Sequence, residues 1–458
     1  MRTVILDTNI VDPRQDRIIE NSTIVIDNGL ISGIYEGIKY RYDYKVNILI
    51  DGENGYLIPG LINHHSHGFT LGPLFPSASK PMSFDNIFYY LNRHLVQGTT
   101  TLLNSDGFAA FEEKELINML HPIKIQTATS YTDLNLKAAE LVDGGGLSEL
   151  HKLINLEEMV NRGAVAIGEI GGGCTLGGAS ASYYYLPKGI EDKIGKRITP
   201  EQGEKLKRAI FGRDMNASSV DKEKVNEILK QIGIAELLNT DEVIEIAKKT
   251  IFSSVEIARE GIKEAVGFAK KYNLPLIVHN AAASKENVLE AAKLLGPKLI
   301  AGHSNHPSFD QEEIFQFIKE LKKYGTIIDI CSGDCFGAKQ IFSSDYIDIN
   351  LDLIEEGMVD LISTDFMGGN WDPMLLLIEK AVKENRISLP KAISMVTYNV
   401  TKAIPKLAIN CGTIDIGKTA DLVILDSKKL SKVNYVLING VPIVEKGEIK
   451  APKPHWIF

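Results

Sequence analysis

The sequence predicts an α/β protein in which a TIM (β/α)8 barrel carries a small discontinuous β-sandwich domain made from both termini. Through the middle of the chain, short apolar runs alternate with longer amphipathic stretches, which is the pattern of repeated βα units. Both ends are instead rich in short strand-like runs separated by Asn-Gly turns. At 458 residues, the chain also exceeds what one hydrophobic core usually supports, so we expect a second, smaller domain.

The predicted β-sandwich joins residues 1–57 to residues 408–458. The first segment contains STIVIDNGLISGI, with Asn28-Gly29 between two apolar runs, and the second contains KVNYVLINGVPIVEKGEI, with Asn439-Gly440 placed in the same way. An Asn-Gly pair between two such runs is typical of a tight β-hairpin. Because neither segment has enough apolar residues for a core of its own, we expect the two to pair.

The predicted barrel domain spans residues 58–407 and contains eight runs that we expect to be its strands. Helical stretches follow most of them, as a barrel of eight βα units requires. The eight runs lie at residues 61–67, 99–105, 124–131, 164–170, 275–280, 298–304, 326–332 and 360–365.

One link in this series is too long for a single crossover helix and indicates an insertion at about residues 171–241. It begins with the glycine-rich stretch GGGCTLGGAS, continues with Tyr183-Tyr184-Tyr185, and then contains helical stretches. Long loops on the catalytic face of a barrel often cover or shape the pocket. A contact between subunits is an equally good interpretation of this segment.

Composition excludes several other classes of protein. The formal net charge is −9, with no dense cluster of Lys and Arg, which argues against nucleic acid as a partner. The N-terminus does not resemble a signal peptide, and no apolar stretch approaches ~18 residues, so we expect a cytoplasmic protein that does not enter membranes. The four cysteines are scattered and should be free thiols, and Cys331 and Cys335 are expected to line the pocket.

The polar residues at the carboxyl ends of the eight runs form the candidate active site, because functional groups of a barrel gather there. One such residue alone means little, since a single histidine at a strand end is usually just hydrogen-bonded. Together, four histidines and two carboxylates on one rim predict a metal site. The six residues are His65 and His67 after the first run, Glu169 after the fourth, His279 after the fifth, His303 after the sixth and Asp365 after the eighth.

This set suits two divalent metal ions, most simply zinc, with iron or manganese as alternatives. We expect His65, His67 and Asp365 to hold one ion, His279 and His303 to hold the other, and Glu169 to bridge them together with a shared hydroxide. Asp365 is then placed to act as a general base and afterwards as a general acid, which makes Asp365 and Glu169 the candidate catalytic residues.

The segment PGLINHHSH at Pro59 to His67, the single histidines after the fifth and sixth runs and Ser-Thr-Asp after the eighth resemble the amidohydrolase superfamily. GTIDIGKTADLVILD near the C-terminus resembles the segment in which such enzymes return to their β-sandwich. The resemblance covers nearly the whole chain. It implies a small-molecule substrate, a metal-dependent hydrolysis and a homo-oligomer, either a dimer or a tetramer.

Two departures narrow the branch of the superfamily that the chain resembles. Hydantoinases, dihydroorotases and ureases carry a carboxylated lysine at the end of the fourth strand, where this chain has Glu169. Cytosine and adenosine type deaminases carry a Glu three residues after the histidine of the fifth strand, where this chain has Ala282. Glu169 in GEIG, the plain histidine after the fifth run and GHSN after the sixth are similar to enamidase and related cyclic-amide hydrolases. This resemblance implies cleavage of a C–N bond in a cyclic amide, lactam or enamide.

Two alternatives stay open. One is an aminohydrolase (deaminase) acting on a purine- or pyrimidine-like heterocycle, with Glu169 or His306 as the proton shuttle. The other is a barrel without catalytic activity that binds a ligand or a partner subunit, although the complete ligand set argues against this possibility.

Four further residues are candidates for substrate binding, each with a plain structural alternative. His306 in SNHP could reach a substrate carboxylate or an oxyanion, or it could stabilise its loop. Asn104 and Asn280 could donate to a substrate carbonyl or hydrogen-bond within loops. Trp371 could wall the pocket or pack under the next helix. His64 alternates away from the ligand face, so we expect a packing or hydrogen-bonded role for it.

Overall fold

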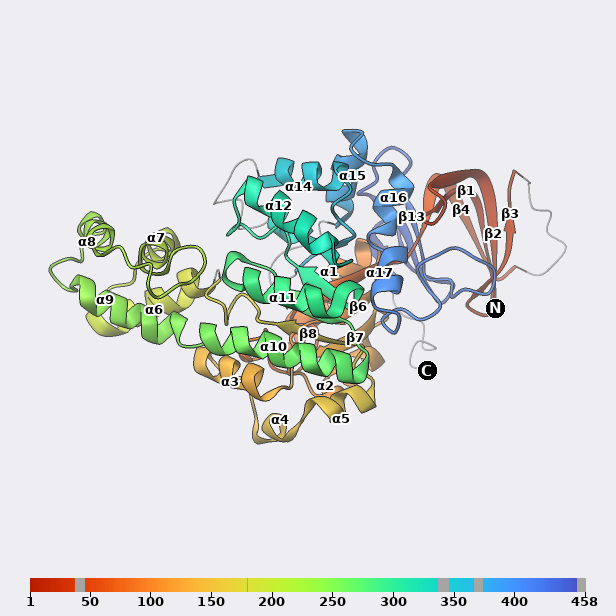
Figure 1. The fold of residues 1–458 in the computed structure, drawn as a ribbon. Helices are drawn as coiled ribbons and strands as arrows, with labels where there is room; N and C mark the ends of the chain where they lie inside the picture. The colour runs from red at the N-terminus through yellow and green to blue at the C-terminus, as the bar shows by residue number, and fades with distance from the viewer. Residues whose placement is uncertain (38–45, 179, 337–345, 366–373, 451–458) are drawn as a thin grey trace.

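The computed structural model describes residues 1–37, 46–178, 180–336, 346–365 and 374–450. Trp371 lies outside the described residues. Figure 1 shows the barrel and its helices in the centre, a β-sheet at one side and an arm of helices at the other. The predicted fold class is confirmed, and among the described helices none is both long and apolar enough to cross a membrane.

The barrel consists of eight parallel strands in sequential order, and each lies within one of the predicted runs. The last strand lies against the first, so the sheet is nearly closed. Their side chains are almost continuously buried, as expected for strands covered on both faces. The strands are β5 (Leu61–Ser66), β6 (Thr99–Asn104), β7 (Lys124–Thr129), β8 (Ala166–Ile170), β9 (Leu276–His279), β10 (Leu299–Gly302), β11 (Ile327–Cys331) and β12 (Leu361–Ser363).

The barrel helices cover the outside of this sheet. In α10 the buried residues Ala258, Ile262, Ala265 and Ala269 recur every three or four positions, and Asn273 ends the helix in the left-handed conformation. The helices are α1 (Phe84–Val96), α2 (Phe111–Leu120), α3 (Asp133–Val142), α4 (Glu149–Leu153), α5 (Leu156–Arg162), α10 (Val255–Tyr272), α11 (Lys285–Leu295), α12 (Gln311–Lys322), α13 (Ser332–Phe336), α14 (Tyr346–Glu355), α15 (Met374–Lys383), α16 (Leu389–Ser394) and α17 (Tyr398–Ala403), with short 3-10 turns at Ala282–Ser284 and Gly296–Lys298.

The two termini form one mixed sheet of eight strands in the order β16-β15-β14-β13-β4-β1-β2-β3. Strand β4 joins the two halves, because it pairs in parallel with β1 and antiparallel with β13. The two Asn-Gly turns lie against each other, because a Cβ atom at Gly29 would come within 3.1 Å of the carbonyl oxygen of Asn439. The strands are β1 (Arg2–Asp12), β2 (Arg17–Asp27), β3 (Leu30–Tyr35), β4 (Ile48–Pro59), β13 (Leu422–Leu425), β14 (Val433–Ile438), β15 (Val441–Glu445) and β16 (Glu448–Ile449).

The insertion forms a helical arm that extends away from the barrel (Figure 1). It has its own hydrophobic core, which includes Leu186, Leu206, Phe211, Leu229 and Val243. A π-helix lies at each end of the arm, and the two π-helices pack against each other. The elements are η1 (Ala181–Tyr185), α6 (Leu186–Ile194), α7 (Pro200–Phe211), α8 (Lys222–Gln231), α9 (Thr240–Ala247) and η2 (Lys248–Phe252).

Candidate metal centre and active site

The six predicted ligand residues come together at the carboxyl end of the barrel. We call this set the floor of the site. All six side chains are buried, and the most exposed of them, Asp365, is only 7% accessible. The floor consists of His65, His67, Glu169, His279, His303 and Asp365.

The floor contains two groups of three residues, and within each group the ligand atoms lie within 4.8 Å of one another. The first group is His65, His67 and Asp365, and the second is Glu169, His279 and His303. Glu169 Oε1 lies 2.8 Å from His279 Nδ1 and 3.6 Å from the Nε2 atoms of both His65 and His303. Its other oxygen, Oε2, lies 3.6 Å from His67 Nε2. One carboxylate therefore faces both groups.

Local backbone geometry aims Glu169 into the barrel. The pairing of β8 with β9 shifts register between Ile167 and Ile170, which is where Glu169 lies. Gly168 has a φ of 137°, and a Cβ atom there would lie only 2.7 Å from the carbonyl oxygen of Ile277. Only glycine fits this position, and the irregularity turns the next side chain toward the histidines.

Two floor residues adopt a backbone conformation that non-glycine residues rarely use. His303 has a φ of 57° and Asp365 a φ of 46°. The peptide N–H of Asp365 donates to the carbonyl oxygen of His65 at 3.1 Å, which ties the first strand to the last at this point. Such left-handed residues cost free energy and are kept where a side chain must point in a required direction.

Asp106, which sequence reasoning missed, orients His67 by a hydrogen bond on the ring nitrogen Nδ1. Its Oδ1 lies 3.0 Å from His67 Nδ1, and the same carboxylate accepts hydrogen bonds from the peptide N–H groups of Gly68 and Phe75. A buried carboxylate on one ring nitrogen sets the tautomer of a histidine and leaves the other nitrogen for a metal. The available signal was its place in the sequence, two residues after β6.

Asp329 holds the other end of the floor and was also missed. Its Oδ1 lies 3.1 Å from His64 Nε2, its Oδ2 lies 3.8 Å from His65 Nδ1, and Ser363 donates to Oδ2 at 3.0 Å. His64 thus has the buried polar partner that we expected for it. Asp329 is the charged residue within the apolar run of β11, and this contrast is the signal that could have revealed it.

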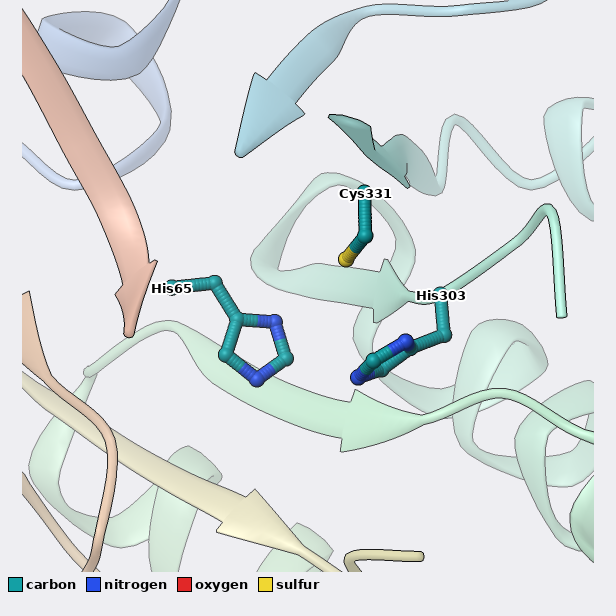
Figure 2. A group of neighbouring side chains, drawn as sticks. All are labelled: His65, His303 and Cys331. Atoms are coloured by element: carbon teal, nitrogen blue, oxygen red, sulfur yellow. The ribbon is translucent and has the colours of Figure 1, made fainter. Parts of the chain in front are cut away.

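Cys331 lies beside Asp329 rather than in the pocket wall. Figure 2 shows its sulfur directed toward the space between the rings of His65 and His303, and the ligand atoms of these three residues lie within 4.8 Å of one another. The Sγ atom lies 3.3 Å from the Ser363 hydroxyl oxygen and 3.7 Å from Asp329 Oδ2. We therefore interpret Cys331 as part of the support behind His65.

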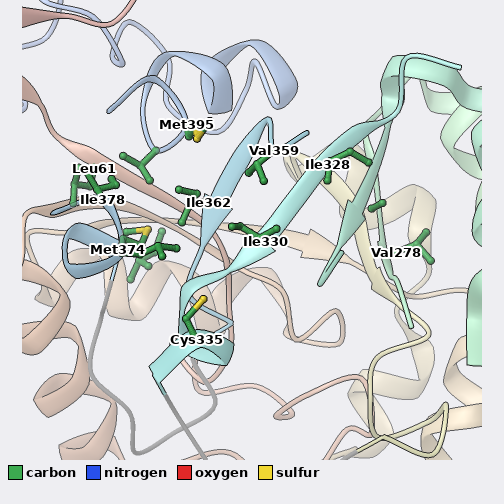
Figure 3. Packing of buried hydrophobic residues seen from close by; sticks show 14 of the residues in the cluster. Leu61, Val278, Ile328, Ile330, Cys335, Val359, Ile362, Met374, Ile378 and Met395 are labelled. Atoms are coloured by element: carbon green, nitrogen blue, oxygen red, sulfur yellow. The ribbon is translucent and has the colours of Figure 1, made fainter. Parts of the chain in front are cut away.

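The expectation that the two cysteines of this region line the pocket is wrong. Cys331 and Cys335 are both fully buried, and Cys335 packs among apolar side chains such as Ile330 and Ile362 (Figure 3). Cys331 is the last residue of β11, and Cys335 lies in the short helix α13 that follows. All four cysteines are free, as expected.

The charges of the floor stabilise one another. Burial alone would raise the pKa of Glu169, but His65 and His279 outweigh burial and hold this pKa well below its usual range. Burial would lower the pKa of His65, yet Glu169 and Asp329 raise it well above its usual value. At His67, Asp106 and Asp365 outweigh burial and raise the pKa to about 9. The floor thus favours positive charge among its carboxylates, which a divalent cation can supply in place of protons.

Above the floor lies a cavity of about 300 Å³. Its wall comes from the loop after β5, the end of α3, the loop after β8 and the π-helix η1, so the start of the arm does shape the pocket. His306 is part of this wall, and its Nδ1 lies 2.7 Å from the Ser308 hydroxyl oxygen. The wall residues outside the floor are Phe75, Pro76, Ser77, Ser79, Asp143, Gly173, Cys174, Ser180, Tyr184, Tyr185 and His306.

Asn104 and Asn280 lie at strand ends but are not among the residues that line the cavity. Both are fully buried. Asn104 Oδ1 accepts a hydrogen bond from the peptide N–H of Phe69, and Asn280 donates to the Ser304 hydroxyl oxygen at 3.1 Å. These bonds agree with the loop-holding alternative, and their contact with substrate stays a prediction.

The residues present fit a pair of divalent metal ions. Both ring nitrogens of His65 are buried and have no hydrogen-bond partner, although Nε2 faces two carboxylates at 3.6 and 3.9 Å. Those separations are too long for hydrogen bonds and leave room for a cation between the groups. Imidazole and carboxylate are the ligands that zinc and its neighbours accept.

A barrel with such a buried ligand set at its carboxyl rim defines a metal-dependent hydrolase. A model of the amidohydrolase family matches residues 193–444, which is more than half of the chain. The chain therefore belongs to the amidohydrolase family, and it is a hydrolase that acts on C–N bonds.

Two full-length relatives differ in their activities. A 5-methylthioadenosine/S-adenosylhomocysteine deaminase from Caldanaerobacter subterraneus subsp. tengcongensis is 20% identical over 98% of this chain and 94% of its own. An imidazolonepropionase from Clostridium tetani is 23% identical over 95% of this chain and 90% of its own. Among solved structures, the L-hydantoinase from Arthrobacter aurescens has a TM-score of 0.56 at 13% identity and covers 98% of this chain and 97% of its own, a likeness of fold alone.

Proposed function

We propose that this protein hydrolyses a C–N bond of a cyclic amide, lactam or enamide, using a pair of divalent metal ions held by the floor. The observation that carries the proposal is the position of Glu169, whose two carboxylate oxygens face the two ligand groups. A carboxylate shared in this way suits a two-metal site.

Each floor residue has a defined role in the proposal. His65, His67 and Asp365 would hold one ion, His279 and His303 the other, and Glu169 would contact both. When bound, such ions polarise a substrate carbonyl and make a nucleophile available at neutral pH. Zinc is the simplest choice, with iron or manganese as alternatives, because the set contains only imidazole and carboxylate groups.

Asp365 would carry the proton. Its Oδ1 lies 3.5 Å from His67 Nε2 and its Oδ2 lies 3.4 Å from His303 Nε2, so the carboxylate stands at the junction of the two groups. One oxygen takes a proton as water adds to the substrate carbonyl carbon. The same proton then passes to the ring nitrogen as the C–N bond breaks, which leaves a carboxylic acid and an amine.

Ala282 supports amide hydrolysis over deamination. It stands where deaminases of this superfamily carry a proton-shuttling Glu, and its peptide N–H donates to the Ser308 hydroxyl oxygen at 2.9 Å. No carboxylate is available at that position to protonate a leaving amino group. The proposed reaction avoids this need, because Asp365 itself serves the ring nitrogen.

The test combines metal analysis with a substrate panel. Protein loaded with zinc, iron or manganese is assayed on cyclic amides, imides, lactams and aminoheterocycles. We expect two ions per chain, ring opening of a cyclic amide and loss of activity in Glu169→Gln. A protein with at most one ion per chain that keeps its activity in Glu169→Gln would contradict the shared carboxylate.

A deaminase activity is the second candidate, and the full-length deaminase relative is the observation that favours it. His306 or Glu169 would then have to replace the missing Glu. Steady release of ammonia from an aminopurine or aminopyrimidine, with the ring intact, would establish this candidate instead. The homo-oligomer and the cytoplasmic location expected from the sequence remain part of the proposal and are checked by light scattering and by cell fractionation.

A further inference from the structure

We propose that the outer wall of the cavity selects substrates with a positively charged or hydrogen-bond-donating arm, such as a primary amine, and that Asp143 binds this arm. The inference rests on the proposed function, because it names the class of ring amide that the same site accepts. It starts from a carboxylate in the wall that the metal floor does not use.

Asp143 is an exposed residue of the cavity lining, and two hydrogen bonds orient its carboxylate. It follows the last residue of α3, and its Oδ2 accepts a hydrogen bond from Ser79 at 2.6 Å, while Oδ1 accepts one from the peptide N–H of Gly145 at 3.0 Å. The turn after it is bound to the opposite loop, because Gly144 donates to the carbonyl of Ser77. A carboxylate positioned in this way loses little freedom when it binds a ligand.

The rest of the outer wall offers hydroxyl and aromatic groups. Ser77 and Ser79 share a hydrogen bond at 2.9 Å, and the rings of Tyr184 and Tyr185 meet edge to face with centroids 5.3 Å apart. Burial raises the pKa of Tyr185, and Cys174 and Asp143 raise it further, so the phenol stays neutral. Tyrosine ring faces attract cations, and hydroxyls accept hydrogen bonds from an ammonium group.

The balance of charge points the same way. Among the described residues that line the cavity, the carboxylates are Glu169, Asp365 and Asp143, and none is Lys or Arg. Metal ions on the floor would offset Glu169 and Asp365. Asp143 would then be the remaining charge of that lining, and its complement is a cation.

A neighbouring small cavity, of about 60 Å³, does contain cations, but they are already paired. Lys207 and Arg208 each lie 2.8 Å from a Glu204 oxygen. Arg213 lies 2.8 Å from Asp310 and 3.2 Å from Glu313. A substrate carboxylate would have to displace one of these partners, so this cavity does not reverse the preference.

The experiment uses zinc-loaded full-length protein and three versions of one ring lactam, with an aminomethyl, a methyl or a carboxymethyl arm. Both kcat/KM and the dissociation constant from calorimetry are measured. We expect the aminomethyl compound to bind about tenfold more tightly than the methyl compound, and the carboxymethyl compound to bind more weakly than either. Asp143→Asn should remove the advantage of the amine.

Glu140→Gln is the matched control. Glu140 lies one helical turn earlier on α3, is exposed and is not part of the cavity wall. The Glu140→Gln substitution removes one negative charge, as Asp143→Asn does, but outside the cavity lining. This variant should therefore prefer the aminomethyl compound as strongly as the wild type does. Equal affinity for all three arms, or an amine preference that survives Asp143→Asn, would overturn the inference. If the three compounds bind in the predicted order but none is hydrolysed, the proposed reaction is wrong and the inference about Asp143 is still supported.

Discussion

The floor of the site and its outer wall are built in opposite ways. Every floor residue lies at or near the end of a barrel strand and is buried; Asp106 hydrogen-bonds His67, and the carboxylate of Asp329 lies 3.8 Å from His65 Nδ1. The wall instead comes from loops and from η1, and Tyr184 in it is 51% exposed. The floor is therefore built for one fixed geometry. The wall can differ between relatives without disturbing the floor, which is how proteins of one fold acquire different substrates.

Asp365→Asn gives the largest expected effect and tests whether the floor carries the proton. The amide cannot take a proton from water, so kcat should fall by about 10²- to 10⁴-fold while KM changes little. Steady-state kinetics on the best ring amide measures both constants. Asp360→Asn, on the run that leads into β12, is the control, because Asp360 pairs with Lys322 away from the site. Activity within tenfold of wild type in Asp365→Asn would rule out this role.

Asp329→Asn tests the support beneath the floor. The amide cannot hold His64 and His65 as the carboxylate does, so metal affinity should fall by about 10- to 100-fold. Competition with a chelator measures the affinity, and metal-free thermal unfolding reports on folding separately. Ser363→Ala removes one hydrogen bond to Asp329 and should give a smaller loss. Unchanged metal affinity in Asp329→Asn would show that the floor does not depend on this support.

The arm that carries part of the wall should respond to acid independently of the floor. Burial would raise the pKa of Glu204, but Lys207 and Arg208 outweigh burial and lower it to about 2. Burial also lowers the pKa of Lys207 despite this pairing, so the prediction relies on Glu204, which has several partners. A carboxyl with a lowered folded pKa stabilises the protein above its unfolded pKa near 4.5 and loses that contribution as pH falls toward 2.

Urea unfolding of wild type and Glu204→Gln measures this contribution. At pH 7 the wild type should be more stable by roughly 1–3 kcal/mol, and the difference should shrink as pH falls from 4.5 toward 2. Glu223→Gln, an exposed change on the same arm, should show no such trend. A difference that does not depend on pH would mean that Glu204 acts through packing rather than charge.

Tyr184→Ala gives the smallest expected effect and tests whether a wall residue contributes to substrate binding alone. Removing a half-exposed ring should raise KM by roughly two- to fivefold and leave kcat and stability nearly unchanged. Tyr184→Phe keeps the ring and should behave as wild type. A fall in kcat with unchanged KM would mean that Tyr184 takes part in the reaction itself, which would contradict a separation of roles between wall and floor.

The same division explains how far the sequence could predict the structure. All eight strands and the six floor residues could be predicted, because barrel strands read as separate apolar runs and their ends share one rim. Asp106, Asp329 and Asp143 could not be assigned their roles. Each acts through a partner that is distant in sequence, such as Asp329 with His64, and that pairing depends on how neighbouring strands are aligned.

The arm shows a second limit. Its helices could be predicted from amphipathic patterns, but their direction away from the barrel depends on packing between helices, which one sequence does not encode locally. The termini show a third limit of prediction from sequence. The sequence predicted that the two terminal segments pair, but the single sheet joined through β4 depends on register between strands that are distant in sequence.

Strand β4 also has a consequence for the order in which the protein is made. Only Gly60 separates β4 from β5, the strand that presents His65, and the second edge of β4 pairs with β13 at residues 422–425. During synthesis that edge has no partner until the ribosome has added more than three hundred further residues. Until β13 has been made, the nascent chain thus carries an open strand edge beside the strand that presents the first floor residue, and in this period aggregation or chaperone binding would compete with folding.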